Sequence, residues 1–235
     1  MDNFYKNVND WYEDSAVKLL NLENNLFRVE RNNQHNNDID LKALFGDEEC
    51  LIDVQYSFNF KRYKDIRIDF MSSGKIKKDY QHISIMDLNE RIMISQDRMK
   101  MFHEIVDIKK GGKFFQENIN LLGVFYFLYD TPKPKEKTLD VLKKEKISHI
   151  CFIPFEVILN EMKTSNEFIY KINDKRKNGI REPFESAFLC INLEKLSKKY
   201  DIPIIRNRSE FPILSNYINE AYNRKKSLNI NPKMK

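Results

Sequence analysis

Apolar and polar residues alternate along two neighbouring stretches near the N-terminus, a pattern typical of strands with one buried face. The stretches cover residues 39–45 and 50–56, and the Gly-Asp pair between them predicts a tight turn. A hairpin closed by this turn places Asp40 directly opposite Asp53, on the face that also carries Gln55. The sequence therefore predicts a β-hairpin with two carboxylates side by side.

Two carboxylates about 4.5–5.5 Å apart on rigid strands repel each other unless a cation lies between them. Hard oxygen ligands select Mg²⁺ or Mn²⁺, so the hairpin suggests a metal site. The simpler alternative is that the acids decorate the solvated face of an antiparallel pair. Because Asp is a poor strand former, its repetition at these positions favours the metal site.

The rest of the chain predicts an α/β fold with a central mixed sheet flanked by helices. Alternation predicts a third strand over residues 63–70, and if this strand pairs beside residues 50–56, Lys61, Lys64 or Arg67 could bring a cation toward a phosphate. The basic stretch 171–181 is expected to form a loop, and the basic tail from Arg224 is expected to fray. Further predictions are helices over residues 8–22, 155–163 and 194–200 and strands over residues 121–129, 149–155 and 186–193.

Composition limits the class of protein. With 41% hydrophobic and 12% aromatic residues, the 235-residue chain is expected to bury a core as a single domain, residues 1–235. It contains no run of 18 apolar residues and no basic, apolar leader, so we expect a cytoplasmic protein without a membrane partner. The three cysteines are far apart, which indicates neither a disulfide framework nor a structural zinc site.

The net charge of +5 is unevenly distributed. Residues 1–60 hold 12 acids and 5 bases (−7), whereas residues 61–235 hold 35 bases and 23 acids (+12). An anionic metal pocket in a cationic body suits a phosphodiester substrate, although a lysine-rich composition can also reflect an AT-rich genome. Two basic turns supply candidate nucleic-acid contacts, namely Lys75, Lys77, Lys78, Lys110 and Lys113.

Asp40, a twelve-residue gap and then Asp53-Val54-Gln55 resemble the active-site signature of the PD-(D/E)XK nuclease superfamily. In that family an acid ends one strand and an acid-x-Lys follows on the next. This chain departs from the pattern at Gln55, where the family usually has Lys. The stretch over residues 11–20 resembles the family's first helix, in which an acid near the start completes the metal shell, and Glu13 is the matching residue.

The resemblance implies a restriction-endonuclease-like core over about residues 8–130 and a C-terminal elaboration over about residues 131–235. It implies metal-dependent hydrolysis of phosphodiester bonds by an endonuclease or exonuclease, in DNA rather than RNA. Glu13, Asp40 and Asp53 would bind Mg²⁺ or Mn²⁺, and Gln55 would orient the attacking water. The alternative, which Gln55 favours, is a catalytically degraded nuclease-fold module that binds nucleic acid or a protein partner; homodimer formation stays open.

Overall fold

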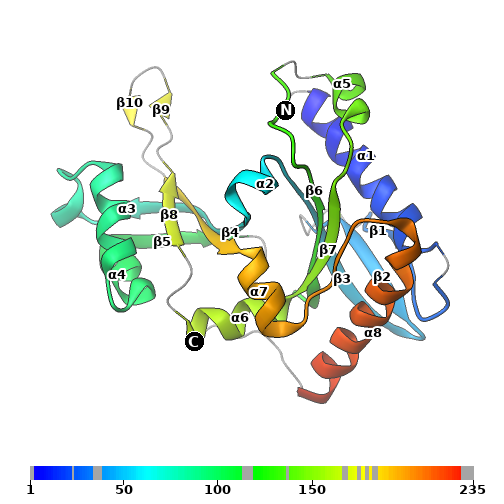
Figure 1. The fold of residues 1–235 in the computed structure, drawn as a ribbon. Coiled ribbons are helices and arrows are strands. Elements are labelled where there is room, and N and C mark those ends of the chain that lie inside the picture. The colour runs from blue at the N-terminus through cyan, green and yellow to red at the C-terminus, as the bar shows by residue number, and fades with distance from the viewer. Residues whose placement is uncertain are drawn as a thin grey trace. The chain divides into compact units, whose positions relative to one another are not determined.

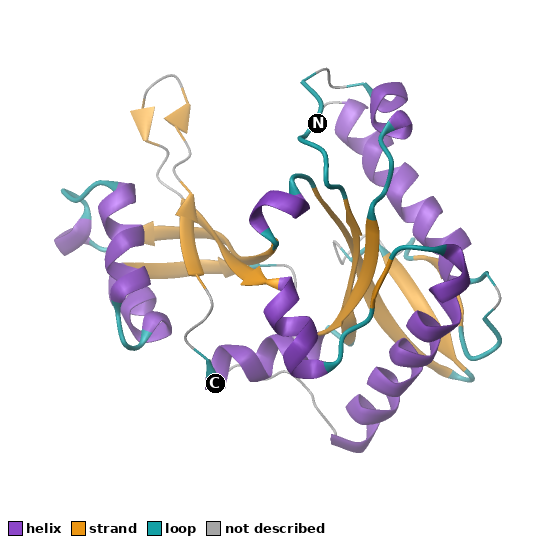
Figure 2. Cartoon of the chain, in the orientation of Figure 1, coloured by secondary structure: helices purple, strands orange, loops and turns teal. Residues whose placement is uncertain are grey.

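The chain forms two compact units, each built around its own β-sheet (Figures 1 and 2). The first unit takes residues 1–64, 120–158 and 193–231, and the second takes residues 65–119, 159–192 and 232–235. The computed structural model describes residues 3–22, 24–33, 39–112, 119–135, 138–165, 169–173, 176–177, 180–181 and 185–228. Whether the two units fold together as the expected single domain stays a prediction.

The first unit contains a six-stranded mixed sheet. Its strands lie in the order β1-β2-β3-β6-β7-β12, and β3 and β6 are the parallel neighbours while the other pairs are antiparallel. The strands are β1 (Arg28–Arg31), β2 (Leu41–Phe45), β3 (Glu48–Ser57), β6 (Leu121–Leu128), β7 (His149–Pro154) and β12 (Ile204–Ile205).

β2 and β3 form the predicted hairpin. Gly46 turns the chain with a φ of 62°, a left-handed conformation that glycine adopts without steric cost. Leu41 pairs with Ile52, so the next position outward sets Asp40 opposite Asp53, as the sequence indicated. A slip of one residue would turn every buried side chain to the other face, which is why the alternation fixes this register.

Helices cover both sides of this sheet, which confirms an α/β fold with a central mixed sheet. Tyr12 of α1 stacks on Tyr56 of β3 with ring centroids 4.3 Å apart, and Tyr222 of α8 stacks on Phe45 of β2 at 4.0 Å. Figure 1 shows α1 and α8 on one side of the sheet and α2 and α7 on the other. The helices are α1 (Asn3–Leu20), α2 (Phe60–Tyr63), α5 (Leu139–Lys144), α7 (Leu193–Tyr200), η3 (Arg208–Glu210) and α8 (Phe211–Leu228). Helix α6 (Phe155–Thr164) begins in the first unit and ends in the second.

The second unit contains a four-stranded antiparallel sheet in the order β5-β4-β11-β8. The expected third strand is real, and its Ile66, Ile68 and Phe70 are buried as predicted, but it pairs with β11 and β5 rather than with β3. The pairing beside residues 50–56, on which the approach of Lys61, Lys64 or Arg67 depended, is therefore wrong. This unit comprises β4 (Asp65–Ile76), η1 (Lys78–Tyr80), α3 (Ile85–Ile94), α4 (Arg98–Ile105), β5 (Val106–Gly111), β8 (Ile169–Asn173), β9 (Arg176–Lys177), β10 (Ile180–Arg181) and β11 (Glu185–Asn192).

Two basic segments are more ordered than expected. The stretch 171–181 contributes to β8, β9 and β10 instead of forming a plain loop, and α8 continues beyond Arg224 to Leu228. Lys225 donates to the carbonyl oxygen of Leu121 at 2.6 Å, which ties the end of α8 to β6. Within the described part of the chain, no helix is long and apolar enough to cross a membrane.

Candidate active site

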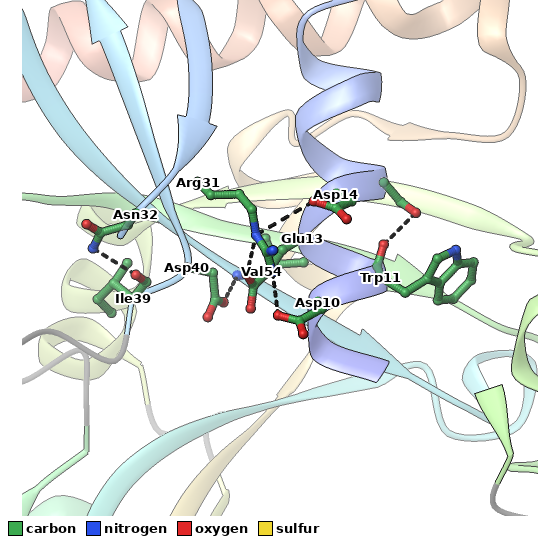
Figure 3. Close-up of polar contacts among 10 residues, drawn as sticks. Asp10, Trp11, Glu13, Asp14, Arg31, Asn32, Ile39, Asp40 and Val54 are labelled. Carbon is green, nitrogen blue, oxygen red and sulfur yellow. Dashed lines mark hydrogen bonds and ion pairs between the residues drawn. The ribbon is translucent and has the colours of Figure 1, made fainter. Parts of the chain in front are cut away.

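Asp40 ends the segment that enters β2, and hydrogen bonds hold it from both sides. Asn32 donates its backbone N–H to the carbonyl oxygen of Asp40 at 2.8 Å and its side-chain amide to the carbonyl oxygen of Ile39 at 2.9 Å. The Asp40 carboxylate, through Oδ2, accepts the backbone N–H of Val54 at 2.7 Å (Figure 3). Because Val54 directly follows Asp53, this bond brings the two acids of the hairpin together.

Asp53 and Gln55 share one face of β3, as residues two apart on a strand must. The Gln55 amide donates to Asp53 Oδ2 at 2.6 Å. The Asp53 side chain has an exposed fraction of 0%, so this face is covered at Asp53 rather than solvated. A carboxylate this deeply buried is costly unless a hydrogen bond or cation compensates it, and so Asp53 is not a decorative surface acid.

Glu13 lies on α1, where Arg31 of β1 binds it. The guanidinium donates to Glu13 Oε2 from Nε at 3.0 Å and from Nη2 at 2.5 Å, and it donates to Asp10 Oδ1 at 2.6 Å. Asp14 Oδ1 lies 3.7 Å from Arg31 Nε. Figure 3 shows the Arg31 side chain reaching from its strand to these helix acids, with Asp40 nearby. One arginine thus neutralises part of a dense group of carboxylates.

The pKa values of Glu13 and Arg31 are set by burial and by charged neighbours, which act in opposite directions. Burial raises the pKa of Glu13, and the neighbouring charge of Asp40 adds to that rise, while the hydrogen bonds from Arg31 oppose it. Burial lowers the pKa of the Arg31 guanidinium, but its hydrogen bonds to Glu13 and Asp10 together raise it above its ordinary value. The influence of Asp40 on Glu13 places this hairpin acid and the helix acids in one electrostatic neighbourhood. We name these residues the acidic cluster: Asp10, Glu13, Asp14, Arg31 and Asp40.

The hairpin register sets Asp40 opposite Asp53, whereas Glu13 is bound to Arg31, so the metal site of Glu13, Asp40 and Asp53 stays a prediction. Tyr56 faces α1, so alternation along β3 turns Asp53 to the opposite side of the sheet. In keeping with this, no group of three or more His, Cys, Asp or Glu side chains among the described residues is arranged to hold a metal ion. Mg²⁺ is commonly held by one or two carboxylates plus substrate phosphate, so Asp40 and Asp53 are a chemically fitting pair.

The candidate nucleic-acid contacts lie apart from this cluster in the chain, in the second unit. Lys77 donates to the carbonyl oxygen of His103 at 2.7 Å and lies 3.7 Å from Asp107, so it ties β4 to α4 and β5. Lys75 and Lys78 are exposed. Lys110 lies in β5, and neither its side chain nor Lys113 belongs to the described part of the structure.

Arg31 is the site residue that the sequence analysis missed. Residues 1–60 hold 12 acids and only five bases, of which Arg31 is one. This imbalance indicates that a base in this segment neutralises several neighbouring carboxylates. No family model, no curated protein and no solved structure matches the chain.

Proposed function

We propose that this protein is a metal-dependent nuclease that hydrolyses phosphodiester bonds in DNA. The observation that supports this most is the bond from the Val54 N–H to the Asp40 carboxylate, which seats Asp40 beside the buried Asp53 on adjacent strands. The resemblance to the PD-(D/E)XK superfamily implies an acid that ends one strand and an acid-x-Lys on the next. In this chain Asp40 stands one residue before β2, and Asp53-Val54-Gln55 lies on β3. On this proposal the first unit carries a restriction-endonuclease-like core.

In this proposal Asp40 and Asp53 would hold Mg²⁺ or Mn²⁺. When bound, such a cation lowers the pKa of a water ligand and offsets the negative charge of the phosphate. Gln55 fixes the orientation of Asp53 through its amide N–H, and its amide oxygen can accept a hydrogen bond from the attacking water. Glu13 remains bound to Arg31, which lowers the repulsion that the helix acids exert on an approaching phosphate.

A second function has its own supporting observation. Arg31 binds Glu13, the residue that would complete the metal shell, and Gln55 stands in place of the usual Lys. A nuclease-fold module that has lost catalysis and only binds nucleic acid or a protein would show these same two features. The two functions differ in whether the backbone of a nucleic acid is cut.

The test is cleavage of plasmid DNA, single-stranded DNA and RNA in the presence of Mg²⁺ or Mn²⁺. Asp53→Asn, which keeps the shape of the buried side chain, should abolish cleavage because it removes a charged metal ligand. Gln55→Ala should be milder, with a loss on the order of 10²-fold, comparable to losing one oriented hydrogen bond in a transition state. Gln55→Lys, which restores the commoner family residue, should keep or raise activity.

Asp47→Asn is the matched control, because it removes the same charge from the exposed turn of the same hairpin and should leave cleavage unchanged. Circular dichroism and chemical unfolding of each variant separate loss of chemistry from loss of folding. Binding of nucleic acid without cutting of any substrate would refute the nuclease and leave the binding module.

A further inference from the structure

The chain leaves β3 through a short helix with a basic and aromatic surface. In α2, Phe60 is 3% exposed and packs edge-on against His149 at 5.5 Å between ring centroids, whereas the next three residues point outward. These are Lys61, Arg62 and Tyr63, and Tyr63 is 53% exposed. The Arg62 guanidinium lies over the Tyr63 ring, 5.2 Å from its centroid. The helix thus presents two cations and one aromatic face to its surroundings.

Two residues with left-handed backbones flank this helix, although neither is glycine. Asn59 has a φ of 59° and Lys64 a φ of 56°. Such conformations persist only where the surrounding structure enforces them, and they are frequent at ligand-binding positions. Here backbone hydrogen bonds enforce them: Asn59 donates to Thr131 at 2.8 Å, Lys64 donates to Phe60 at 2.8 Å, and Lys64 accepts from Leu193 at 2.9 Å. The helix is therefore held firmly at both ends.

The bond from Asn59 to Thr131 places a second basic segment beside α2, although it lies about seventy residues later in the chain. This segment reads Pro-Lys-Pro-Lys over residues 132–135, and Lys133 and Lys135 are both exposed. Its prolines restrict the backbone, so the two lysines are presented with little conformational freedom. We name the five residues the basic tip: Lys61, Arg62, Tyr63, Lys133 and Lys135.

Other cations of this unit are neutralised by carboxylates. Arg31, Lys64 and Lys226 each pair with a carboxylate. Among the residues that the structure describes, no carboxylate lies within ion-pair distance of the four tip cations, and the Glu145 carboxylate near this segment accepts a hydrogen bond from Thr131 instead. Exposed cations around an accessible aromatic ring are the combination that binds a nucleic-acid strand: the cations contact phosphates and the ring stacks on a base.

We propose that the basic tip is a contact surface for a nucleic-acid strand. The inference rests on the proposed nuclease function, because β3 carries Asp53 and leads directly into this surface. Six Cα–Cα steps of extended chain lead from Asp53 to Asn59, so the residue that precedes α2 lies at most about 20 Å from Asp53. That span corresponds to at most about six nucleotides of a duplex strand. The α2 part of the basic tip would therefore contact the substrate at a distance of this order or less from the cut.

Fluorescence anisotropy with labelled oligonucleotides tests the surface without any cleavage step, because EDTA removes divalent cations. Single-stranded DNA, duplex DNA and RNA of the same sequence form the three arms. The double variant Lys61→Gln/Arg62→Gln should weaken duplex binding and reduce the slope of log affinity against log salt by about 1.8, the value for two phosphate contacts. The matched control is Lys143→Gln/Lys144→Gln, two adjacent exposed cations of α5, which should leave the slope unchanged.

Substitutions of Tyr63 distinguish the contribution of base stacking from that of charge. Tyr63→Ala should weaken single-stranded binding about tenfold and duplex binding less, whereas Tyr63→Phe should bind as the wild type does. Equal binding of DNA and RNA would show that the basic tip contacts the phosphate backbone that both share. A preference for one would identify which nucleic acid the tip binds. The inference is overturned if no oligonucleotide binds, or if the Lys61/Arg62 variant behaves like the control pair.

The outcomes for the tip and for the nuclease are distinguishable. Loss of binding in the Lys61/Arg62 variant together with no cleavage by the wild type would support the tip and refute the nuclease. Cleavage that depends on Asp53, with unchanged binding by the tip variants, would refute the tip alone.

Discussion

Removing Arg31 should expose how strongly the acidic cluster depends on it. The variant Arg31→Gln deletes two hydrogen bonds to Glu13 and one to Asp10 and leaves both carboxylates ionised without their cation. The side chains of Arg31 and Glu13 are 33% and 18% exposed, whereas that of Asp10 is 41% exposed. The Glu13 contact is therefore the better shielded of the two, and most of the loss should come from it.

The magnitude follows from these exposures. The two bonds from Arg31 converge on one oxygen of the better shielded Glu13 and together contribute about 1.5 kcal/mol, and the more exposed ion pair with Asp10 contributes about 0.5 kcal/mol. Arg31→Gln should thus lower the free energy of unfolding by about 2 kcal/mol and the melting temperature by about 4–8 °C. Adding Glu13→Gln should recover the larger part, with a coupling energy of about 1.5 kcal/mol in the double-mutant cycle.

Urea unfolding followed by circular dichroism measures these differences, provided that each variant unfolds in a single transition. Arg28→Gln is the matched control, because Arg28 is an exposed arginine of the same strand, and it should change the free energy of unfolding by less than about 0.5 kcal/mol. If Arg31→Gln costs no more than Arg28→Gln, Arg31 does not hold the acidic cluster together.

The ionisation of Glu13 makes the free energy of unfolding depend on pH, and the direction of that dependence follows from the pKa shift. The folded pKa of Glu13 lies above its ordinary value of 4.5, so between these two values the native state binds more protons than the unfolded state. Stability must then fall as pH rises through that interval, and it levels off above the folded pKa. Arg31→Gln should move the levelling-off to higher pH, and Glu13→Gln should abolish this part of the profile.

Two further predictions concern metal binding and the other end of the sheet. Mg²⁺ or Mn²⁺ at a hundredfold excess over its Kd should stabilise the protein by about 2.7 kcal/mol, and the gain should vanish in Asp53→Asn but persist in Asp47→Asn; an unchanged melting temperature in the wild type would favour the module without a metal. Burial lowers the pKa of His149 from 6.5, so stability should rise with pH through the interval below 6.5 and be lost on acidification, and urea unfolding of His149→Gln between about pH 5 and about pH 7 should lack that slope.

The hairpin and its paired acids could be predicted because local rules determine them. A glycine turn and strict alternation leave one register that buries Ile39, Leu41 and Ala43, and this register carries Asp40 to Asp53. The helix over residues 211–228 also left a signal, since Phe211, Leu214, Ile218 and Ala221 recur at helical spacing and are buried. The basic residues at its end obscure this signal, because a run of cations near a terminus is also typical of a frayed tail.

The second sheet and the role of Arg31 could not be predicted in the same way. Alternation along residues 63–70 specifies which side chains point inward, but not which strand lies alongside, and the partners of β4 come from residues 106–111 and 185–192. Likewise the alternation around Arg31 predicts no contact with α1, because that contact depends on how a helix packs over a strand. Such long-range pairings are properties of the assembled fold.

The acids themselves favour the nuclease over a module that only binds nucleic acid. Phosphate backbones are repelled by carboxylates, so a binding surface gains nothing from Asp40 seated beside a buried Asp53, and it would lose affinity from them. Complete burial of the Asp53 carboxylate in a strand also costs folding free energy, which an apolar residue at the same position would not cost. On the proposed function, a divalent cation would turn both costs into binding contacts, because it would be held by the same oxygens that otherwise repel the substrate. Arg31 would then neutralise the helix acids that such a cation does not contact.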